Sequence, residues 1–421
     1  MDKIIIEGGQ KLKGKMKVSG AKNATLPILA ACLLTDEPCE IENVPKVQDT
    51  FTMIKILRAL SVKVDFEEGK IYVKPNSYKC YTAPYKLVST MRASVCVLGP
   101  LLAKLGRAHV SMPGGCIIGP RPVNLHLKGL DLLGADIKIE HGYIEAKARK
   151  LRGNVIYLGG AFGSSVLATS NVMMAATLAK GVTILENAAC EPEIVDLGNF
   201  LIKMGAKIKG LGSNIIEVEG VKALGGAKHK VIPDRIEAGT YMVASAITGG
   251  EVELEEACFE HLGAVIDQLR QAGIIVKKTQ DGILVKGRLR RPHPLEITTL
   301  PYPGFPTDLQ AQFTAFLSLA KGISIVREKI YPQRFMHISE LNRMGARIKL
   351  EGDSAIIEGS SFLSGAPVMA SDLRASAALV LGGLVARGKT EIQRIYHLDR
   401  GYEKLEKKLS KIGAKIKRTK V

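Results

Sequence analysis

One sequence pattern occurs six times in this chain. In each copy a helix ends in an apolar residue, a small residue follows, and then comes a strand in which apolar and polar residues alternate. The interval between copies is about 70 residues, which is strong evidence of internal duplication. The small residue that follows each helix marks the copies, at Ser61, Gly134, Gly205, Gly273, Gly345 and Gly413. A fold for this chain must therefore accommodate six similar units.

Each unit repeats the same order of elements. An apolar helix of small residues comes first, as in LPILAACLL (26–34) and SAALVLGGLVA (376–386). These helices lack a polar face, so we expect them to be buried. A strand rich in β-branched residues, an amphipathic helix and two further strands follow. Glycine after the amphipathic helix fits a left-handed cap.

Six units in 421 residues suggest two lobes of three. Residues 230–235 lie between the third and fourth units, and Pro233 disfavours a continuous helix there. The strand Lys3 to Ile6 lacks a partner in the first unit, so we expect it to complete the other lobe. The predicted domains are residues 22–231, and residues 1–21 with 232–421. We expect the active site in the cleft between them.

The net charge of +18 limits the classes of partner. Nucleic acid, a membrane surface or a small anionic substrate would each suit a basic protein. No apolar run approaches the roughly 18 to 20 residues of a membrane helix, and the first residues do not resemble a signal peptide. We therefore expect a cytoplasmic protein. Seven scattered cysteines and eight histidines show no spacing typical of disulfide frames or metal sites.

The segment 111–122, SMPGGCIIGPRP, places a thiol and a guanidinium in a glycine-rich loop with proline at its end. Positive charge near a cysteine lowers the pKa of its thiol from about 8.5. Cys116 with Arg121 is therefore a candidate reactive site. The alternative is that Cys116 is a small buried apolar residue, as free cysteines commonly are.

The chain resembles the enolpyruvyl transferase family in a series of motifs that covers nearly its whole length. The motifs are GAKNATLPILAA from residue 20, MRAS from 91, PGGC from 113, RPVNLH from 121, ENAACEPE from 186, FPTDLQAQF from 305, RFMH from 334, SDLRAS from 371 and YHLDRGYE from 396. The resemblance implies an α/β (α+β) fold, a two-lobed inside-out barrel. It has six βαβαββ repeats, three around a pseudo-threefold axis in each lobe.

The resemblance also implies a reaction. The enolpyruvyl group of phosphoenolpyruvate moves to the 3′-hydroxyl of UDP-N-acetylglucosamine by addition and elimination, phosphate leaves, and no metal or cofactor is needed. It implies these two small substrates, with no nucleic acid, membrane or obligate protein partner. Peptidoglycan synthesis is the process that uses such a product.

Burying the phosphate and the carboxylate of phosphoenolpyruvate requires paired positive charge, for which arginine and lysine are suited. By motif match, the resemblance implies that Lys22, Arg121 and Arg400 hold the phosphate. It implies that Arg334 and Arg400 hold the carboxylate. Cys116 matches the general acid at C3 of phosphoenolpyruvate. With Asp308, Lys22 and Arg400 it forms the expected catalytic set.

Asp308, in FPTD, matches the residue that accepts or holds the proton of the sugar hydroxyl. The alternative is that Asp308 caps a helix, since FPTDLQAQF looks like a helix start. Asp372, beside Arg374, is a second candidate acceptor. The other binding residues that the resemblance implies are Asn23, Arg92, Pro122, Val123, Asn124, Leu125, Ser165, Val166, Ile330 and Arg374. Gly163 stands where many relatives have lysine, which removes one expected charge from the diphosphate site.

Other functions stay open on the sequence alone. The sister enzyme that makes 5-enolpyruvylshikimate 3-phosphate shares the expected fold and cations but lacks the PGGC segment. A non-catalytic basic repeat protein could bind RNA, with an affinity that falls steeply with salt. A paralogue that keeps the fold without activity is a third alternative.

Overall fold

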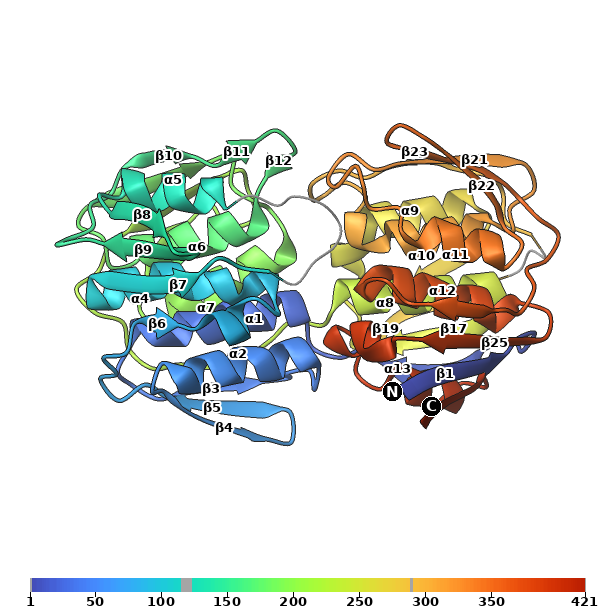
Figure 1. Ribbon diagram of the computed structural model, residues 1–421, viewed down its shortest axis with the longest axis horizontal. Coiled ribbons are helices and arrows are strands. Elements are labelled where there is room, and N and C mark those ends of the chain that lie inside the picture. Colours follow the sequence, from blue (N-terminus) through green and yellow to red (C-terminus); the bar gives the residue numbers. More distant parts are fainter. Residues whose placement is uncertain (1, 115–122, 288–290, 421) are drawn as a thin grey trace. The chain divides into compact units, whose positions relative to one another are not determined.

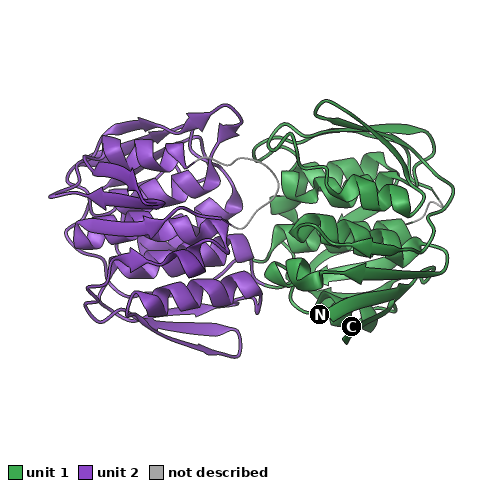
Figure 2. Cartoon of the chain, in the orientation of Figure 1, with its two compact units in different colours: residues 1–19, 117–119, 233–421 green, residues 20–116, 120–232 purple. Residues whose placement is uncertain are grey.

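Two compact units make up the chain in the computed structural model, which describes residues 2–114, 123–287 and 291–420 (Figure 1). Unit 1 contains the described residues up to Ser19 and from Pro233 onward, and unit 2 contains those from Gly20 to Ile232 (Figure 2). The chain passes from one unit to the other after Ser19 and again after Ile232.

Unit 2 contains three four-stranded sheets of identical pattern. In each, a short first strand runs parallel to the second, and the third and fourth strands follow antiparallel. In this order the sheets are β16 (Lys228–Lys230), β3 (Cys39–Glu42), β5 (Lys70–Lys74) and β4 (Lys63–Glu67); β6 (Thr82–Ala83), β7 (Arg107–Ser111), β9 (Tyr143–Lys147) and β8 (Asp136–Glu140); β10 (Val155–Tyr157), β13 (Val182–Glu186), β15 (Ile215–Glu219) and β14 (Lys207–Lys209).

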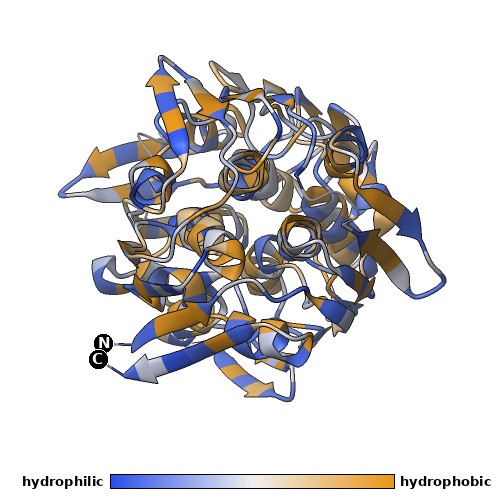
Figure 3. Ribbon diagram, turned by 90° about the vertical axis from the view of Figure 1, so that its right-hand side faces the viewer, coloured by the Kyte–Doolittle hydropathy of each residue, from blue (hydrophilic) through white to orange (hydrophobic). Residues whose placement is uncertain are grey.

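Unit 1 repeats this pattern three times. Its sheets are β2 (Lys13–Lys17), β17 (Glu251–Glu255), β19 (Gly282–Lys286) and β18 (Ile275–Lys278); β20 (Glu296–Thr298), β21 (Ile323–Arg327), β23 (Ser354–Glu358) and β22 (Arg347–Glu351); β24 (Pro367–Met369), β25 (Lys389–Gln393), β1 (Asp2–Glu7) and β26 (Lys415–Lys420). Hydrophobic and hydrophilic residues alternate along these strands, as Figure 3 shows, because one face of each sheet packs on the core.

Three apolar helices form the centre of each unit, as the sequence predicts. In unit 1, α8 (Arg235–Thr248), α10 (Gln310–Leu317) and α12 (Leu373–Val385) pack against one another. In unit 2, α6 (Val166–Ala176) packs against α1 (Lys22–Ala31) and α4 (Leu98–Leu105). Every residue of α10 is buried, and in α1 every residue except Asn23 is buried. Helices that are apolar all round are stable only inside a core.

The outer helices are amphipathic and carry the six repeat markers at their ends. They are α2 (Gln48–Ala59), α5 (Asn124–Leu132), α7 (Pro192–Lys203), α9 (Gly263–Gln271), α11 (His337–Arg343) and α13 (Leu405–Lys411). The markers Ser61, Gly134, Gly205, Gly273, Gly345 and Gly413 all have positive φ, between 66° and 102°. At Gly205, the N–H bonds to Ile202 and the next N–H, of Ala206, reaches back to Leu201. This is the expected left-handed cap.

The first strand of the chain completes the last sheet. β1 lies between β25 and β26, with Ile4 opposite Ile392 on one side and Arg418 on the other. The prediction that strand 3–6 completes the lobe formed by the later repeats is therefore confirmed. Ile4 and Ile6 are fully buried there, which fixes the register of the strand.

Candidate functional site

Two buried arginines hold the carboxylate of Asp308 in unit 1. Asp308 lies in the turn η4 (Thr307–Leu309) that leads into α10, Arg334 precedes α11, and Arg374 lies in the first turn of α12. Arg334 Nη1 donates to Asp308 Oδ1 and Arg374 Nη2 donates to Asp308 Oδ2, each at 2.7 Å. The arginine side chains are only 8% and 3% exposed. Three predicted site residues from three separate segments are thus in direct contact.

This arrangement keeps Asp308 ionised. Burial by itself would raise the pKa of its carboxyl, but the charges of Arg374 and Arg334 outweigh burial and lower that pKa well below its usual value. A carboxylate held this way is a poor proton acceptor. Loss of either ion pair would raise that pKa.

Asp308 does not cap a helix, so that alternative is wrong. Among the described residues, the positions before η4 and before α10 have no side-chain cap. Asp372 is the residue that caps: its Oδ1 accepts from the N–H groups of Arg374 and Ala375, at 2.8 and 3.2 Å. Capping gives Asp372 a structural role at the start of α12.

Further ionisable groups surround this cluster. Arg400 ends the turn η5 (Ile395–Arg400). Burial lowers the pKa of His397, Arg400 lowers it further, and Asp372 partly opposes both. Burial likewise lowers the pKa of His337 to about 4, although Asp372 opposes this shift. Both histidines are therefore neutral near pH 7, and the positive charge of this region comes from arginine.

Thr307, beside Asp308, is part of the same cluster. Its Oγ1 accepts from Arg334 Nη1 at 3.0 Å and lies 2.9 Å from Oε2 of Glu328. The sequence analysis did not identify Thr307 or Glu328. A glutamate directly after a strand and six residues before Arg334 was the available signal, but its two threonine partners are 21 and 29 residues away in sequence.

In unit 2, Lys22 is buried at the first position of α1 and its Nζ lies 3.3 Å from Oδ2 of buried Asp49. Asn23, the next residue, is partly exposed. Arg92, also partly exposed, begins the turn η2 (Arg92–Val97). The lysine is thus held by a carboxylate from α2.

The segment predicted to bind diphosphate forms a tight hairpin before α6. Its strands are β11 (Gly159–Gly160) and β12 (Gly163–Ser164), and Gly163 has a φ of 93°. Ser165 Oγ caps α6 by accepting from the Ala168 N–H at 3.3 Å, and Val166 is the first helical residue. Helix N-termini favour anions, and the described first turn of α6 contains no acidic residue to oppose one.

Val123 and Asn124 begin α5, and Leu125 follows them. A Cβ atom placed on Gly160 would lie 3.2 Å from Cδ1 of Leu125, so this helix start lies against the hairpin. Ile330 is partly exposed in unit 1, and its N–H donates to Glu328. Cys116, Arg121 and Pro122, which the sequence analysis also predicts, lie outside the described residues.

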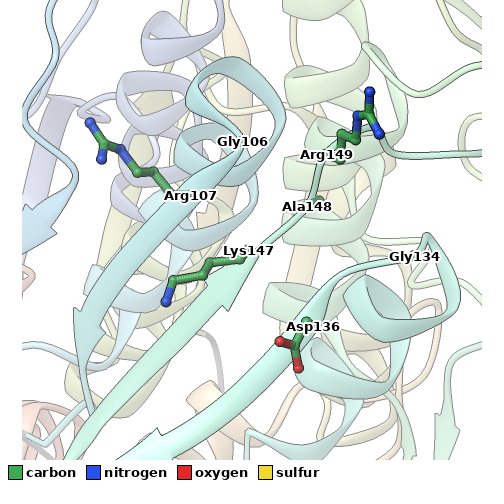
Figure 4. A pocket seen from close by; sticks show the side chains of 7 residues that line it. All are labelled: Gly106, Arg107, Gly134, Asp136, Lys147, Ala148 and Arg149. Carbon is green, nitrogen blue, oxygen red and sulfur yellow. The ribbon is translucent and has the colours of Figure 1, made fainter.

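A pocket of about 590 Å³ lies elsewhere in unit 2, at the ends of β7, β8 and β9 (Figure 4). Side chains of both charges surround it, and it is lined by Gly106, Arg107, Gly134, Asp136, Lys147, Ala148 and Arg149. None of the predicted site residues belongs to this lining, so the pocket is separate from the candidate site. In residues 2–114, 123–287 and 291–420, no group of three or more His, Cys, Asp or Glu side chains could hold a metal ion.

The model of the EPSP synthase (3-phosphoshikimate 1-carboxyvinyltransferase) family matches residues 6–409. The chain belongs to this family. Similar relatives are named UDP-N-acetylglucosamine 1-carboxyvinyltransferase. Those of Caldanaerobacter subterraneus and Carboxydothermus hydrogenoformans are each 54% identical and cover 99% of both chains. That of Geobacter metallireducens is 54% identical and covers 100% of both.

Solved structures of enolpyruvyl transferases have the same fold. The enolpyruvyl transferase NikO from Streptomyces tendae has a TM-score of 0.90 at 23% identity, covering 100% of this chain and 99% of its own. EPSP synthase from Acinetobacter baumannii has a TM-score of 0.75 at 20% identity, covering 100% of both. These likenesses confirm the predicted two-lobed α/β fold of the EPSP synthase family. No helix among the described residues of this chain is long and apolar enough to cross a membrane.

Proposed function

We propose that this protein is a UDP-N-acetylglucosamine 1-carboxyvinyltransferase, which transfers the enolpyruvyl group of phosphoenolpyruvate to the sugar. The observation that carries the proposal is the 54% identity to relatives of that name over 99–100% of both chains. The family model bears the name of a sister activity, 3-phosphoshikimate 1-carboxyvinyltransferase. The structures of that sister enzyme are only 20% identical, and they support the fold alone.

The reaction balances without a metal or organic cofactor. The 3′-oxygen of the sugar bonds to C2 of phosphoenolpyruvate while Cys116 delivers a proton to C3. The hydroxyl proton passes to Asp308. In the second step a proton returns from C3 to the Cys116 thiolate, the C2–O bond to phosphate breaks as the C2–C3 double bond of the vinyl ether forms, and the proton on Asp308 passes to the departing phosphate. The products are the enolpyruvyl sugar nucleotide and inorganic phosphate.

The proposed anion-binding residues are those of the sequence prediction. Lys22, Arg121 and Arg400 hold the phosphate, and Arg334 with Arg400 holds the carboxylate. The burial of Arg334 and Lys22 supports this assignment, because a buried cation requires an anionic partner and is well suited to hold an anion. Arg374 and Arg92 support these groups.

We propose that substrate binding frees Asp308. Its two oxygens accept hydrogen bonds from Arg334 and Arg374. When the carboxylate of phosphoenolpyruvate replaces Asp308 Oδ1 on Arg334, Asp308 keeps one arginine and its pKa rises toward its usual value of about 3.9. The base therefore becomes more basic only when the anion has arrived. Asp372 is a weaker candidate for the base because its Oδ1 already caps α12.

The nucleotide half of the substrate is assigned to unit 2. Ser165 and Val166 at the start of α6 are proposed to contact the diphosphate, and residues 121–125 to contact the uridine. Asn23, Ile330 and Asp308 are proposed to contact the sugar. Both substrates are small anions, which is consistent with a net charge of +18. The cytoplasmic location expected from the sequence is part of this proposal.

A phosphate-release assay tests the proposed function. The protein is mixed with phosphoenolpyruvate and UDP-N-acetylglucosamine, and the product is identified by mass spectrometry as the sugar nucleotide with an added enolpyruvyl group. Shikimate 3-phosphate replaces the sugar nucleotide in a parallel reaction. Phosphate release with shikimate 3-phosphate alone would favour the sister activity. If no phosphate is released with either acceptor and the protein binds RNA in a salt-sensitive way, the non-catalytic RNA-binding alternative would be favoured.

A further inference from the structure

A buried glutamate that the proposed chemistry does not use lies next to the Asp308 cluster. Glu328 follows β21 directly and is 0% exposed. Removing a carboxylate from water costs several kcal/mol unless its oxygens accept hydrogen bonds. A buried glutamate at the edge of a binding region therefore requires an explanation.

Four described donors bind the Glu328 carboxylate. Oε1 accepts from Thr299 Oγ1 at 2.7 Å and from the N–H groups of Ile330 and Tyr331, both at 2.9 Å. Oε2 accepts from Thr307 Oγ1 at 2.9 Å. One side chain thus joins the end of β20, the turn η4 and the segment that leads from β21 to Arg334.

The contact with Thr307 determines what that threonine can offer to Arg334. A hydroxyl has one proton to donate and lone pairs with which to accept. Because Oε2 of Glu328 takes the proton, the lone pairs of Thr307 Oγ1 face Arg334 Nη1, which donates to it at 3.0 Å. The same Nη1 donates to Asp308 Oδ1 at 2.7 Å. Glu328 therefore fixes the Thr307 hydroxyl, one of the two neighbouring acceptors that together hold Nη1 of Arg334.

We infer that Glu328 is a positioning residue: through the hydroxyl of Thr307 and the backbone of residues 330–331, it sets the place and direction of the Arg334 guanidinium. The inference rests on the proposed function in one respect, that Arg334 binds the carboxylate of phosphoenolpyruvate. Bidentate binding of a carboxylate depends on the direction of the guanidinium plane. Loss of Glu328 thus weakens binding of phosphoenolpyruvate more than binding of the sugar nucleotide.

A merely structural role for Glu328 predicts a different result. Loss of a structural glutamate lowers the folded fraction, so activity falls while the KM for each substrate stays the same. A positioning role raises the KM for phosphoenolpyruvate selectively. The two roles are therefore separated by the KM values of the folded protein.

Glu328→Gln is the first variant, because it keeps the shape of the side chain and removes its charge. Thr307→Val removes the hydroxyl and leaves the other three partners of Glu328 intact, so it covers the case in which Glu328→Gln does not fold. Thr307→Ser returns a hydroxyl. Glu358→Gln is the matched control, since Glu358 lies on β23 in the same unit and is 61% exposed.

We expect Glu328→Gln and Thr307→Val to raise the KM for phosphoenolpyruvate about tenfold or more, which corresponds to about 1.4 kcal/mol. The KM for UDP-N-acetylglucosamine should stay within about twofold, Thr307→Ser should restore most of the loss, and Glu358→Gln should match the wild type. An unchanged KM for phosphoenolpyruvate in both folded variants, beside an active wild type, would overturn the inference.

A crystal structure of Glu328→Gln separates this inference from the proposed function, because it needs no activity. We expect Arg334 Nη1 to leave hydrogen-bonding distance of Thr307 or Asp308. If Arg334 keeps both contacts, Glu328 does not position it. If the wild type turns over neither acceptor, the proposed function fails. The position of Arg334 in the crystal structure of Glu328→Gln then decides by itself whether Glu328 positions this arginine.

Discussion

Arg334 Nη1 lies 2.7 Å from Oδ1 of Asp308, so the proposed base and a proposed anion-binding cation neutralise each other. Arg374 holds the other oxygen of Asp308, so a substrate carboxylate that binds Arg334, as proposed, must compete with Asp308. If phosphoenolpyruvate binds Arg334 as proposed, its affinity and the pKa of Asp308 are therefore coupled.

Asp308→Ala is expected to abolish most turnover, by about 10²-fold or more, since general-base catalysis contributes about 10²- to 10⁴-fold. UDP-N-acetylglucosamine should bind within about tenfold of the wild type. Phosphoenolpyruvate should bind at least as tightly as in the wild type, because its internal competitor for Arg334 is gone. Steady-state kinetics and calorimetric titration measure these quantities. Asp267→Ala, at an exposed position of α9, is the control. Near-normal turnover would mean that another residue accepts the proton.

Lys408→Met is expected to make stability depend on pH. Glu237 is buried, and its Oε1 lies 2.7 Å from Lys408 Nζ. Burial raises the pKa of Glu237, although Lys408 opposes the shift. Without Lys408 that pKa rises further. Glu237 is protonated in both states well below the unfolded value of about 4.3, and stability is lost as the pH rises through the higher folded value.

The Lys408→Met variant should therefore lose up to about 3 kcal/mol of unfolding free energy at pH 8 and clearly less at pH 5. Urea unfolding at the two pH values measures the difference. Lys411→Met, at an exposed position of the same helix, should show no such dependence. An equal loss at both pH values would show that the lysine contributes packing and not charge.

Gly205→Ala and Ser61→Gly form a matched pair in unit 2. A Cβ atom on Gly205 would meet nothing within 4 Å, so the substitution adds only backbone strain at a φ of 102°. We expect a loss of about 1–2 kcal/mol. Ser61 has a φ of 66°. Ser61→Gly should relieve about 1–2 kcal/mol of backbone strain, while glycine costs about 0.5–1 kcal/mol of entropy. The net effect on stability should therefore be neutral or stabilising. Urea unfolding of unit 2 tests both, and equal losses would contradict this explanation.

Cys116 is expected to be the one cysteine alkylated by the phosphonate epoxide fosfomycin. A thiol near several cations is partly ionised at neutral pH and nucleophilic, and the phosphonate imitates the phosphate of phosphoenolpyruvate. Intact mass should show a single adduct, and peptide mapping should place it at Cys116. Cys116→Ser should lose the adduct and most activity, because a hydroxyl is a much weaker acid. Cys116→Asp should lose the adduct but keep activity. An adduct at another cysteine would refute the assignment.

The repeat made the fold accessible from sequence. The six cap positions followed from spacing alone, and even Ser61, which is not a glycine, adopts the expected left-handed conformation. The apolar helices were predictable because nothing but a core can hold a helix without a polar face. The lobe to which strand 3–6 belongs followed from its lack of a partner in the first repeat, but its two partner strands come from the structure.

The site was harder to predict from the sequence, because its ion pairs join side chains that lie far apart along the chain. Asp308 and Asp372 both precede helices, and only the structure shows that Asp372 caps while Asp308 binds arginines. Glu328 gave no motif, because its four donors come from three segments. The pairing of Lys22 with Asp49 was missed for the same reason.

The place of β1 between β25 and β26 has a consequence for synthesis on the ribosome. Every strand of the three four-stranded sheets of unit 2 has been made once residue 232 has emerged, so this unit can fold while the chain is still growing. Residues 2–7 emerge before unit 2, yet the partners of β1 are made only at residues 389–393 and 415–420. β1 thus stays unpaired while unit 2 and most of unit 1 are made. The two apolar residues that it must eventually bury, Ile4 and Ile6, are what a chaperone acting on the nascent chain would find exposed.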